Sequence, residues 1–206
     1  MKKALISLEG IHGSGKTTLA NRLLEELKNS DVACLFSKDQ AGTPFSEAIR
    51  NLNLDERTAV DLYTETFLVA AARRQTYVDV IVPALNQGQL VITERFVDSF
   101  FAYGAARNLP STFVTEIAER TCGGNFPDLT LLLDIAPRVG MERIAKFKKH
   151  RIELEGDDFH NCLRQGYLDQ AKSHSQRFVV IDASQPLELV LTAAMAAIRS
   201  RAYLQA

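Results

Sequence analysis

Short apolar runs alternate with longer amphipathic stretches along the whole chain, and this alternation limits the fold more than any other feature. The stretches between the runs repeat apolar residues every three or four positions, as helices do. Strands that alternate with helices form a parallel sheet with helices on both faces. The sequence therefore predicts an α/β fold with five parallel strands, at residues 4–8, 32–37, 90–93, 128–134 and 178–182.

Helices are expected between and after these strands, at residues 16–29, 44–51, 61–87, 98–106, 112–121, 137–149, 157–173 and 186–201. The helix at 61–87 is the longest, and it is apolar almost all round between Phe67 and Ala72. A helix with apolar residues on every side lies in a core or in an interface. Both readings of this helix remain open from the residues alone.

Length and composition favour one globular domain, residues 1–206, because domains run roughly 100–200 residues. A net charge of −1 argues against a protein that binds nucleic acid through a general basic surface. Three cysteines without CxxC spacing fit a reducing compartment. No apolar run has the length of a transmembrane helix, and none has the pattern of a secretory leader. We therefore expect a cytoplasmic protein that has no membrane or nucleic-acid partner.

A glycine-rich loop follows the first expected strand and precedes the first expected helix. Its residues fit the pattern GxxxxGK[ST], whose backbone N–H groups surround phosphates. Lys16 would contact the β- and γ-phosphates of ATP and act in catalysis, and Thr17 would hold Mg²⁺. A glycine-rich turn that binds nothing is the alternative. The predicted cofactor-binding residues are Gly10, Ile11, His12, Gly13, Ser14, Gly15, Lys16, Thr17 and Thr18.

Six segments, in order, resemble those of the thymidylate kinases, over residues 3–190. LEGIHGSGKTT resembles the family's FEGxDGSGKST, and AGTPFSEAIR resembles GGTPxGExIR. AAARRQ with VIVPAL resembles AADRAQ with VIKPAL, and VITERFVDSFFAY resembles VISDRYVDSSLAY. The segments PDLTLLLDI and RFVVIDASQPLE are similar to the family's fourth strand and adenine-side segment.

This resemblance implies the P-loop NTPase fold, with a lid, and an enzyme that transfers the γ-phosphoryl group of ATP to dTMP, giving dTDP. It implies Mg²⁺ as the metal and a homodimer, whose interface would be the helix at 61–87. The alternative for that helix is a place in the core only.

The resemblance also assigns residues of the phosphate and metal sites. Arg73 would grip the acceptor phosphate, since a guanidinium binds phosphate through two hydrogen bonds. Arg95 would lie near both phosphate groups and act in catalysis, and Glu94 would join Thr17 at Mg²⁺. A surface ion pair is the alternative for Glu94 and Arg95.

Asp98, Ser99 and Tyr103 match a segment near the acceptor nucleoside, and Tyr103 is the strongest candidate to line the pocket. A helix cap or a core position is the alternative for each of the three.

A basic run spans residues 146–151 and resembles the lid that closes over ATP, at about residues 143–156. Members of the family carry the cation that stabilises the transferring group either in the phosphate loop or in the lid. Residues 11–14 contain no arginine, so the resemblance implies that the lid supplies it. Arg151 is the first choice, followed by Lys146 and Lys148. Alone, such a run would be a solvated helix face or, less often, a nucleic-acid patch.

Four positions depart from the family, and all concern the acceptor. His12 replaces a carboxylate that contacts the sugar, and Val69 replaces a phenylalanine that stacks on thymine. Lys38 replaces an arginine that reads the base, and Gly104 replaces a glutamine near it. These departures motivate one alternative, a related kinase with another nucleotide acceptor. A non-catalytic nucleotide-binding protein is the alternative of a different class. The predicted substrate-binding residues are His12, Lys38, Val69, Arg73, Asp98 and Tyr103.

Overall fold

The computed structural model describes residues 3–55, 60–146, 151–201 and 203. Its five strands form one parallel sheet in the order β2-β3-β1-β4-β5, which confirms the predicted fold class. The strands are β1 (Ala4–Glu9), β2 (Cys34–Lys38), β3 (Leu90–Glu94), β4 (Leu129–Asp134) and β5 (Phe178–Asp182). Leu8 of β1 pairs with Glu94 of β3, which pairs with Lys38 of β2. The three strands therefore end together at one edge of the sheet.

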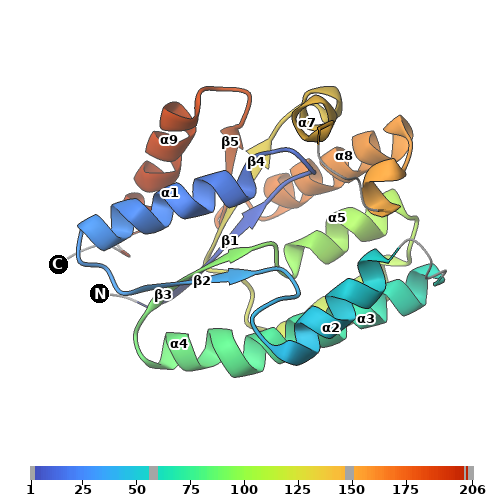
Figure 1. Cartoon of the computed structure of the whole chain (residues 1–206), viewed down its shortest axis with the longest axis horizontal. Coiled ribbons are helices and arrows are strands. Elements are labelled where there is room, and N and C mark those ends of the chain that lie inside the picture. Colours follow the sequence, from blue (N-terminus) through green and yellow to red (C-terminus); the bar gives the residue numbers. More distant parts are fainter. Residues whose placement is uncertain (1–2, 56–59, 147–150, 202, 204–206) are drawn as a thin grey trace.

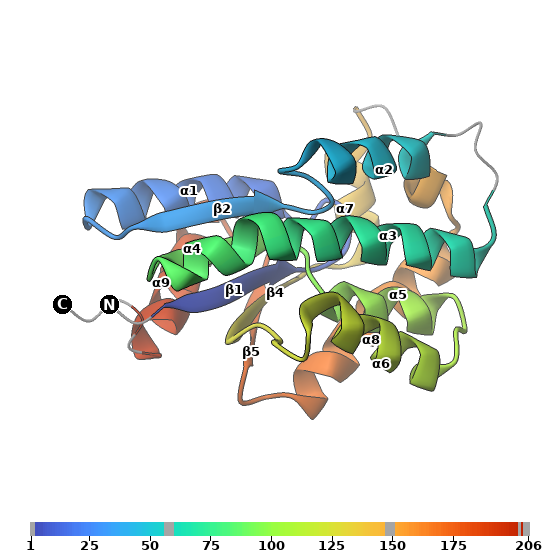
Figure 2. The ribbon, with the colours of Figure 1, turned by 90° about the horizontal axis from the view of Figure 1, so that it is seen from below.

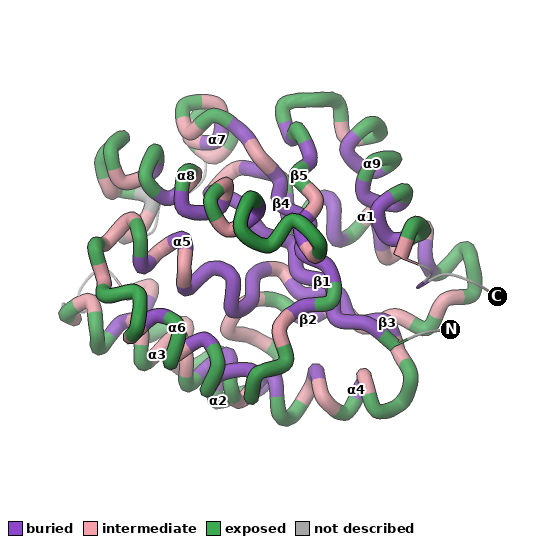
Figure 3. The backbone as a smooth tube through the Cα atoms, turned by 180° about the vertical axis from the view of Figure 1, so that it is seen from behind, coloured by how far each residue is buried: buried purple, intermediate pink, exposed green. Residues whose placement is uncertain are grey.

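Helices cover both faces of the sheet (Figure 1). On one face lie α1 (Lys16–Asn29) and α9 (Leu187–Ser200), and on the other lie α5 (Asp98–Ala106) and α8 (Asp157–Ser173). The tube in Figure 3 is buried almost throughout β1 and β4. The strand β1 is buried on both sides, which explains its nearly continuous apolar run.

The predicted helix at 61–87 is present, but it is not α-helical throughout. It consists of α3 (Leu62–Thr76), a π-helical turn (Tyr77–Ile81) and α4 (Val82–Asn86), which run on as one long rod (Figure 2). The wide turn ends two residues before Pro83, which has no N–H to donate to the carbonyl four residues earlier. The repeat of apolar residues at helical spacing, from which the helix was predicted, does not indicate this turn.

The remaining helices surround the edge where the strands end. They are α2 (Pro44–Leu54), α6 (Ser111–Cys122) and α7 (Pro137–Ile144), with a 3₁₀ turn at Arg151–Leu154. Thr43 caps α2 by accepting a hydrogen bond from the Ser46 N–H at 3.0 Å. The prediction of a helix at 137–149 was wrong in length, because α7 ends at Ile144. Residues 147–150 lie outside the described part of the chain.

Candidate active site

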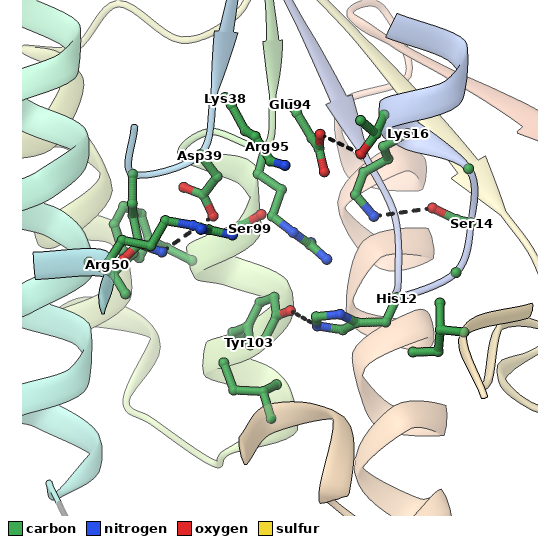
Figure 4. Close-up of a pocket in the computed structure, with 18 of the residues that line it drawn as sticks. His12, Ser14, Lys16, Lys38, Asp39, Arg50, Glu94, Arg95, Ser99 and Tyr103 are labelled. Atoms are coloured by element: carbon green, nitrogen blue, oxygen red, sulfur yellow. Dashed lines mark hydrogen bonds between the residues drawn. The ribbon is translucent and has the colours of Figure 1, made fainter. Parts of the chain in front are cut away.

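A cavity of about 830 Å³ opens where β1, β2 and β3 end (Figure 4). Ligands in parallel sheets bind at this edge, where loops and helix N-termini converge. The glycine-rich loop lines one end of the cavity, and α2, α3 and α5 line the other. This shape offers one space for two ligands placed end to end.

The glycine-rich loop packs closely against α7. Gly13 has a φ of +74°, and a Cβ atom there would lie 2.1 Å from the carbonyl oxygen of Gly140. A Cβ on Gly140 would in turn lie 2.4 Å from the carbonyl oxygen of His12. Neither position accepts a side chain without backbone movement. The two glycines thus allow the loop to pack this closely against α7.

Lys16 lies inside this loop and is buried (Figure 4). Its Nζ donates to the carbonyl oxygens of Gly10 at 3.1 Å and Ile11 at 2.8 Å, and to Ser14 Oγ at 3.2 Å. Burial, with the nearby Arg95 cation, lowers the pKa of Lys16 to about 7. An anion placed beside it would restore the charged state, so this ammonium group suits a phosphate.

Thr17 and Glu94 meet at the base of the loop, where Thr17 Oγ1 donates to Glu94 Oε2 at 2.8 Å. A hydroxyl and a carboxylate so close supply two oxygen ligands for Mg²⁺, which usually keeps waters and substrate oxygens as its other ligands. Among the described residues, no three His, Cys, Asp or Glu side chains form a metal-binding group. The residues present therefore fit a metal shared with a nucleotide, not one enclosed by protein.

Arg95 is buried in the cavity wall, in a left-handed conformation with a φ of +63°. Its Nη1 donates to Tyr167 Oη at 2.7 Å. Tyr167 Oη lies 2.9 Å from Ser99 Oγ, which donates to Glu9 Oε2 at 2.7 Å. Tyr167 of α8 thus holds the guanidinium, and the first turn of α5 and the end of β1 hold the tyrosine hydroxyl in turn. Arg95 is not part of a surface ion pair with Glu94.

Arg73 reaches the same cavity from α3 and is held by Asp39. Its Nε and Nη2 donate to the two carboxylate oxygens of Asp39 at 2.8 and 3.1 Å. Burial alone would raise the pKa of Asp39, but the Arg73 guanidinium lowers it below the usual value. The adjacent Arg74 is exposed and lies outside the cavity. Arg73 is therefore the arginine of this pair that can face a phosphate.

All four departing positions line the cavity. Tyr103 Oη lies 3.1 Å from His12 Nε2, so the glycine-rich loop and α5 meet across the cavity at this point (Figure 4). Val69 and Lys38 both line the cavity. A Cβ on Gly104 would lie 2.5 Å from Val114 Cγ2, so α6 fills the space that a side chain would need.

The prediction that Asp98 contacts substrate needs correction. Asp98 is fully buried and does not line the cavity. Its carboxylate accepts hydrogen bonds from Arg177 Nη2 at 2.7 Å, Arg177 Nη1 at 2.8 Å and Thr130 Oγ1 at 2.7 Å. A carboxylate so saturated ties α5 to β4 and to the residue preceding β5. Asp98 is a structural residue.

The lid prediction falls partly outside the described residues. Arg151 begins a 3₁₀ turn, and Lys146 is exposed just after α7; Lys148 is not described. Arg143 of α7, which no motif indicated, lines the cavity and donates to the carbonyl oxygen of Ala183 at 3.0 Å. No sequence signal separates Arg143 from the other arginine of α7.

Two carboxylates at the site were also missed. Glu9 is buried at the end of a largely apolar strand, and this position was a signal that could have found it. Asp39 is half-buried and directly follows Lys38, at the end of β2. Each carboxylate accepts hydrogen bonds from a residue that lines the cavity, Glu9 from Ser99 and Asp39 from Arg73.

Comparison with known proteins agrees with this geometry. Residues 8–194 match the family model described as thymidylate kinase. A thymidylate kinase of Geobacillus sp. (strain WCH70) is 39% identical over 96% of this chain and 97% of its own. One of Geobacillus thermodenitrificans is 41% identical over 98% of this chain and 92% of its own. A thymidylate kinase of Ligilactobacillus salivarius is 40% identical over 93% of this chain and 95% of its own. No helix in the described residues could cross a membrane.

The family model and the relatives, which match over nearly the whole chain, show that the chain belongs to the thymidylate kinase family, and its function is that of a thymidylate kinase.

Proposed function

We propose that this cavity transfers the γ-phosphoryl group of Mg²⁺-bound ATP to dTMP, with each ligand held by its own buried cation. The observation that carries the proposal is the presence of Lys16, Arg95 and Arg73 in the wall of one cavity. Phosphoryl transfer depends mostly on positioning and charge stabilisation, and three cations along one path supply both.

In this proposal Lys16 and the loop N–H groups hold the β- and γ-phosphates of ATP. Arg73, kept in place by Asp39, holds the phosphate of dTMP, and Arg95 lies between the two. A phosphate oxygen of dTMP bonds to the γ-phosphorus while the bond from that phosphorus to the β-phosphate oxygen breaks. The electron pair of the broken bond stays on ADP. The attacking phosphate is already ionised, so no general base is required.

Thr17 and Glu94 would hold the magnesium ion. Bound there with ATP, Mg²⁺ neutralises phosphate charge, which is the chemistry that the metal supplies. The hydrogen bond between Thr17 and Glu94 keeps the two oxygen atoms together before the metal binds.

The lid at about residues 143–156 supplies the last cation. Arg151 follows α7 closely in the chain and begins a 3₁₀ turn, and Ile152 of that turn lines the cavity. Replacing Arg151 by alanine should lower kcat by about 100-fold or more, because the transferring group loses a charge partner. The exposed Arg138 of α7 gives the matched control, and Arg138→Ala should leave kcat within about twofold. An unchanged kcat in Arg151→Ala would remove this residue from the mechanism.

A homodimer through α3 is the assembly that we propose. Tyr63 and Phe67 are 44% and 53% exposed on α3, and Val78 is 43% exposed in the π turn. Phe113 of α6 packs against the two aromatic rings, with centroids 4.8 and 5.6 Å away. A Phe67→Asp variant should elute as a monomer in size-exclusion chromatography with light scattering, while the wild type elutes as a dimer. A monomeric wild type would contradict the assembly.

The two phosphate sites can be tested separately. Arg73→Ala should raise the KM for dTMP by about 30-fold or more and leave the KM for ATP within about twofold, because a charged hydrogen-bonded pair to phosphate is lost. Arg74→Ala changes the neighbouring, exposed arginine and should alter neither KM. A higher KM for ATP in Arg73→Ala would mean that Arg73 binds ATP, which contradicts its assignment to the phosphate of dTMP.

A further inference from the structure

The glycine-rich loop has one side chain besides Lys16 that can carry a positive charge, and it is His12. Residues 10–17 contain no arginine. His12 lines the cavity, and its Nε2 lies 3.1 Å from Tyr103 Oη (Figure 4). The imidazole thus reaches from the loop, at one end of the cavity, to α5 at the other.

The backbone and the ring of His12 are both held in place. The His12 carbonyl oxygen would lie 2.4 Å from a Cβ atom on Gly140, so this backbone packs directly on α7. The imidazole meets Tyr103, whose ring lies 6.2 Å from that of Phe159 on α8, centroid to centroid. The position of the imidazole is therefore set before a ligand enters, which is the condition for electrostatic stabilisation without reorganisation.

Arg95 lies between His12 and Lys16. Its guanidinium carbon lies 5.5 Å from the centroid of the Tyr103 ring, whose hydroxyl meets His12. After burial, the charge of Arg95 is the next cause of the lowered pKa of Lys16. Figure 4 shows the ends of the three basic side chains turned toward the same part of the cavity. Phosphate groups held there by Lys16 and Arg95 would also face His12.

The empty cavity favours a neutral imidazole. Histidine has an ordinary pKa of about 6.5, and nearby cations disfavour its charged form. Burial raises the pKa of the Tyr103 phenol, so this partner is neutral and can donate to a ring nitrogen or accept from one. In the described part of the wall, the other titratable or charged groups around the imidazole are mostly cations: Lys16 at the start of α1, Arg95 after β3 and Arg143 on α7, with Glu94 at the end of β3 and, behind Arg95, Tyr167 of α8.

Bound nucleotides reverse this balance. The phosphates of ATP and dTMP bring several negative charges into the cavity, and an opposite charge within about 4–6 Å raises the pKa of a cationic group by about 1–3. An imidazolium donates from both ring nitrogens, so it can keep Tyr103 as a partner and also donate to a phosphate oxygen. His12 would therefore take up a proton as the nucleotides bind.

We infer that His12, as an imidazolium, is a catalytic residue that stabilises the transferring phosphoryl group beside Lys16 and Arg95. It keeps its proton throughout, so the bonds that form and break are those of the proposed transfer, on which the inference rests. A contact between His12 and a sugar hydroxyl would need a hydrogen bond but no charge. Proton uptake and its effect on kcat therefore distinguish the two roles.

The first test counts protons. Isothermal titration calorimetry in buffers of different ionisation enthalpy measures proton uptake when Mg²⁺, the β,γ-imido analogue of ATP and dTMP bind at pH 7.5. The wild type should take up about half a proton or more per active site beyond His12→Gln, which keeps a neutral hydrogen-bond partner for Tyr103. Lys16 is present in both proteins, so its own uptake cancels in the difference.

The second test follows kcat with pH. A group whose pKa is raised in the complex is fully charged below its ordinary pKa and loses its charge as the pH rises through the raised one. The wild-type kcat should therefore fall between about pH 7.5 and pH 9.5, and His12→Gln should lack this fall. At pH 7, His12→Gln should lower kcat about tenfold or more, because the transition state loses one cation.

His12→Asp separates the charge from the hydrogen bond. Aspartate can accept a hydrogen bond from a sugar hydroxyl but repels phosphate, so kcat of His12→Asp should be about tenfold lower than that of His12→Gln. A kcat for His12→Asp at or above that of His12→Gln would overturn the inference, because it would show that no positive charge is needed at this position.

His174→Gln is the matched control, since His174 is exposed at the end of α8 and does not line the cavity. It should match the wild type in proton uptake and in kcat. The thermal midpoint shows whether each His12 variant is folded, and the pH profile of the wild type needs no variant. Equal proton uptake by the wild type and a folded His12→Gln, or a wild-type kcat that does not fall by about pH 9.5, would overturn the inference alone. A wild type that does not phosphorylate dTMP would overturn the proposed function as well.

Discussion

Arg95 and Tyr167 are 72 residues apart in the chain, yet Arg95 Nη1 donates to Tyr167 Oη across 2.7 Å. The tyrosine oxygen lies 2.9 Å from Ser99 Oγ, which donates to the buried Glu9 carboxylate. Glu9 Oε1 also accepts from the Phe96 N–H at 2.7 Å. Arg95, which we propose acts in catalysis, has a left-handed backbone conformation. It is therefore fixed both through its side chain and through its neighbouring backbone.

Removing the Tyr167 hydroxyl should loosen Arg95 without removing its charge. Tyr167→Phe is expected to lower kcat about tenfold and to leave the KM for both nucleotides within about threefold, because positioning is lost and not binding. Steady-state kinetics measures both effects. Tyr203→Phe, which removes a buried hydroxyl far from the cavity, is the control and should be silent.

Ser99→Ala provides a second test of the same chain of hydrogen bonds. If Tyr167 acts through Ser99 and Glu9, the double variant Ser99→Ala/Tyr167→Phe should be little slower than Tyr167→Phe alone. Fully additive losses in kcat would mean that the two hydroxyls act independently.

Replacing Glu94 by glutamine should weaken the response to metal. The amide keeps the size and one oxygen but loses the charge, so the Mg²⁺ concentration for half-maximal activity should rise by about tenfold. A Mg²⁺ titration at saturating ATP and dTMP measures the shift. Activity lost equally at all Mg²⁺ concentrations would indicate a role for Glu94 other than metal binding.

Gly13 is predicted to be irreplaceable because of its close contact with Gly140, and not only because of its positive φ angle. Gly13→Ala should lower the free energy of unfolding by about 2 kcal/mol or more, since its Cβ would overlap the carbonyl oxygen of Gly140. Gly88 has a similar φ of +79°, and among the described residues no atom lies within 4 Å of the point where its Cβ would be, so Gly88→Ala measures the backbone strain alone. Equal losses in the two variants, by urea unfolding, would refute the contact argument.

The Asp39–Arg73 pair should make stability sensitive to acid. Burial would raise the pKa of Asp39, but Arg73 holds it below the usual 3.8. A carboxylate with a depressed folded pKa stabilises the protein above its unfolded pKa and loses that contribution as the pH falls through the folded pKa. Between about pH 5 and about pH 3, the wild type should therefore lose more unfolding free energy than Asp39→Asn. Urea unfolding at the two pH values would count against the pair if both proteins lost the same amount.

The sequence predicted the sheet, the loop and most helices because their signals are local. The run Ala4–Glu9 and the glycines after it specify a buried strand and a phosphate loop without reference to the rest of the chain. The π turn before Pro83 and the early end of α7 depend on geometry within one turn, which an apolar pattern does not encode. These are the places where the prediction of secondary structure was incomplete or wrong.

The site was predictable only in part, for the same reason. Lys16 was predicted from the pattern of the glycine-rich loop and Arg73 from the family resemblance, and both line the cavity. The partners that hold them are distant in sequence: Asp39 follows β2 while Arg73 lies on α3, and Tyr167 lies on α8. Asp98 was misassigned because its partner Arg177 is 79 residues away in the chain, and the residues around Asp98 give no sign of that contact.

One assay separates the proposed reaction from its alternatives, namely ADP formation by the purified protein with Mg²⁺, ATP and a panel of nucleoside monophosphates. We expect turnover with dTMP well above that with dCMP, dAMP, dGMP and UMP, and its loss in Lys16→Ala. Faster turnover of another acceptor, or ATP binding without acceptor-dependent ADP formation, would contradict the transfer of the γ-phosphoryl group to dTMP in this cavity.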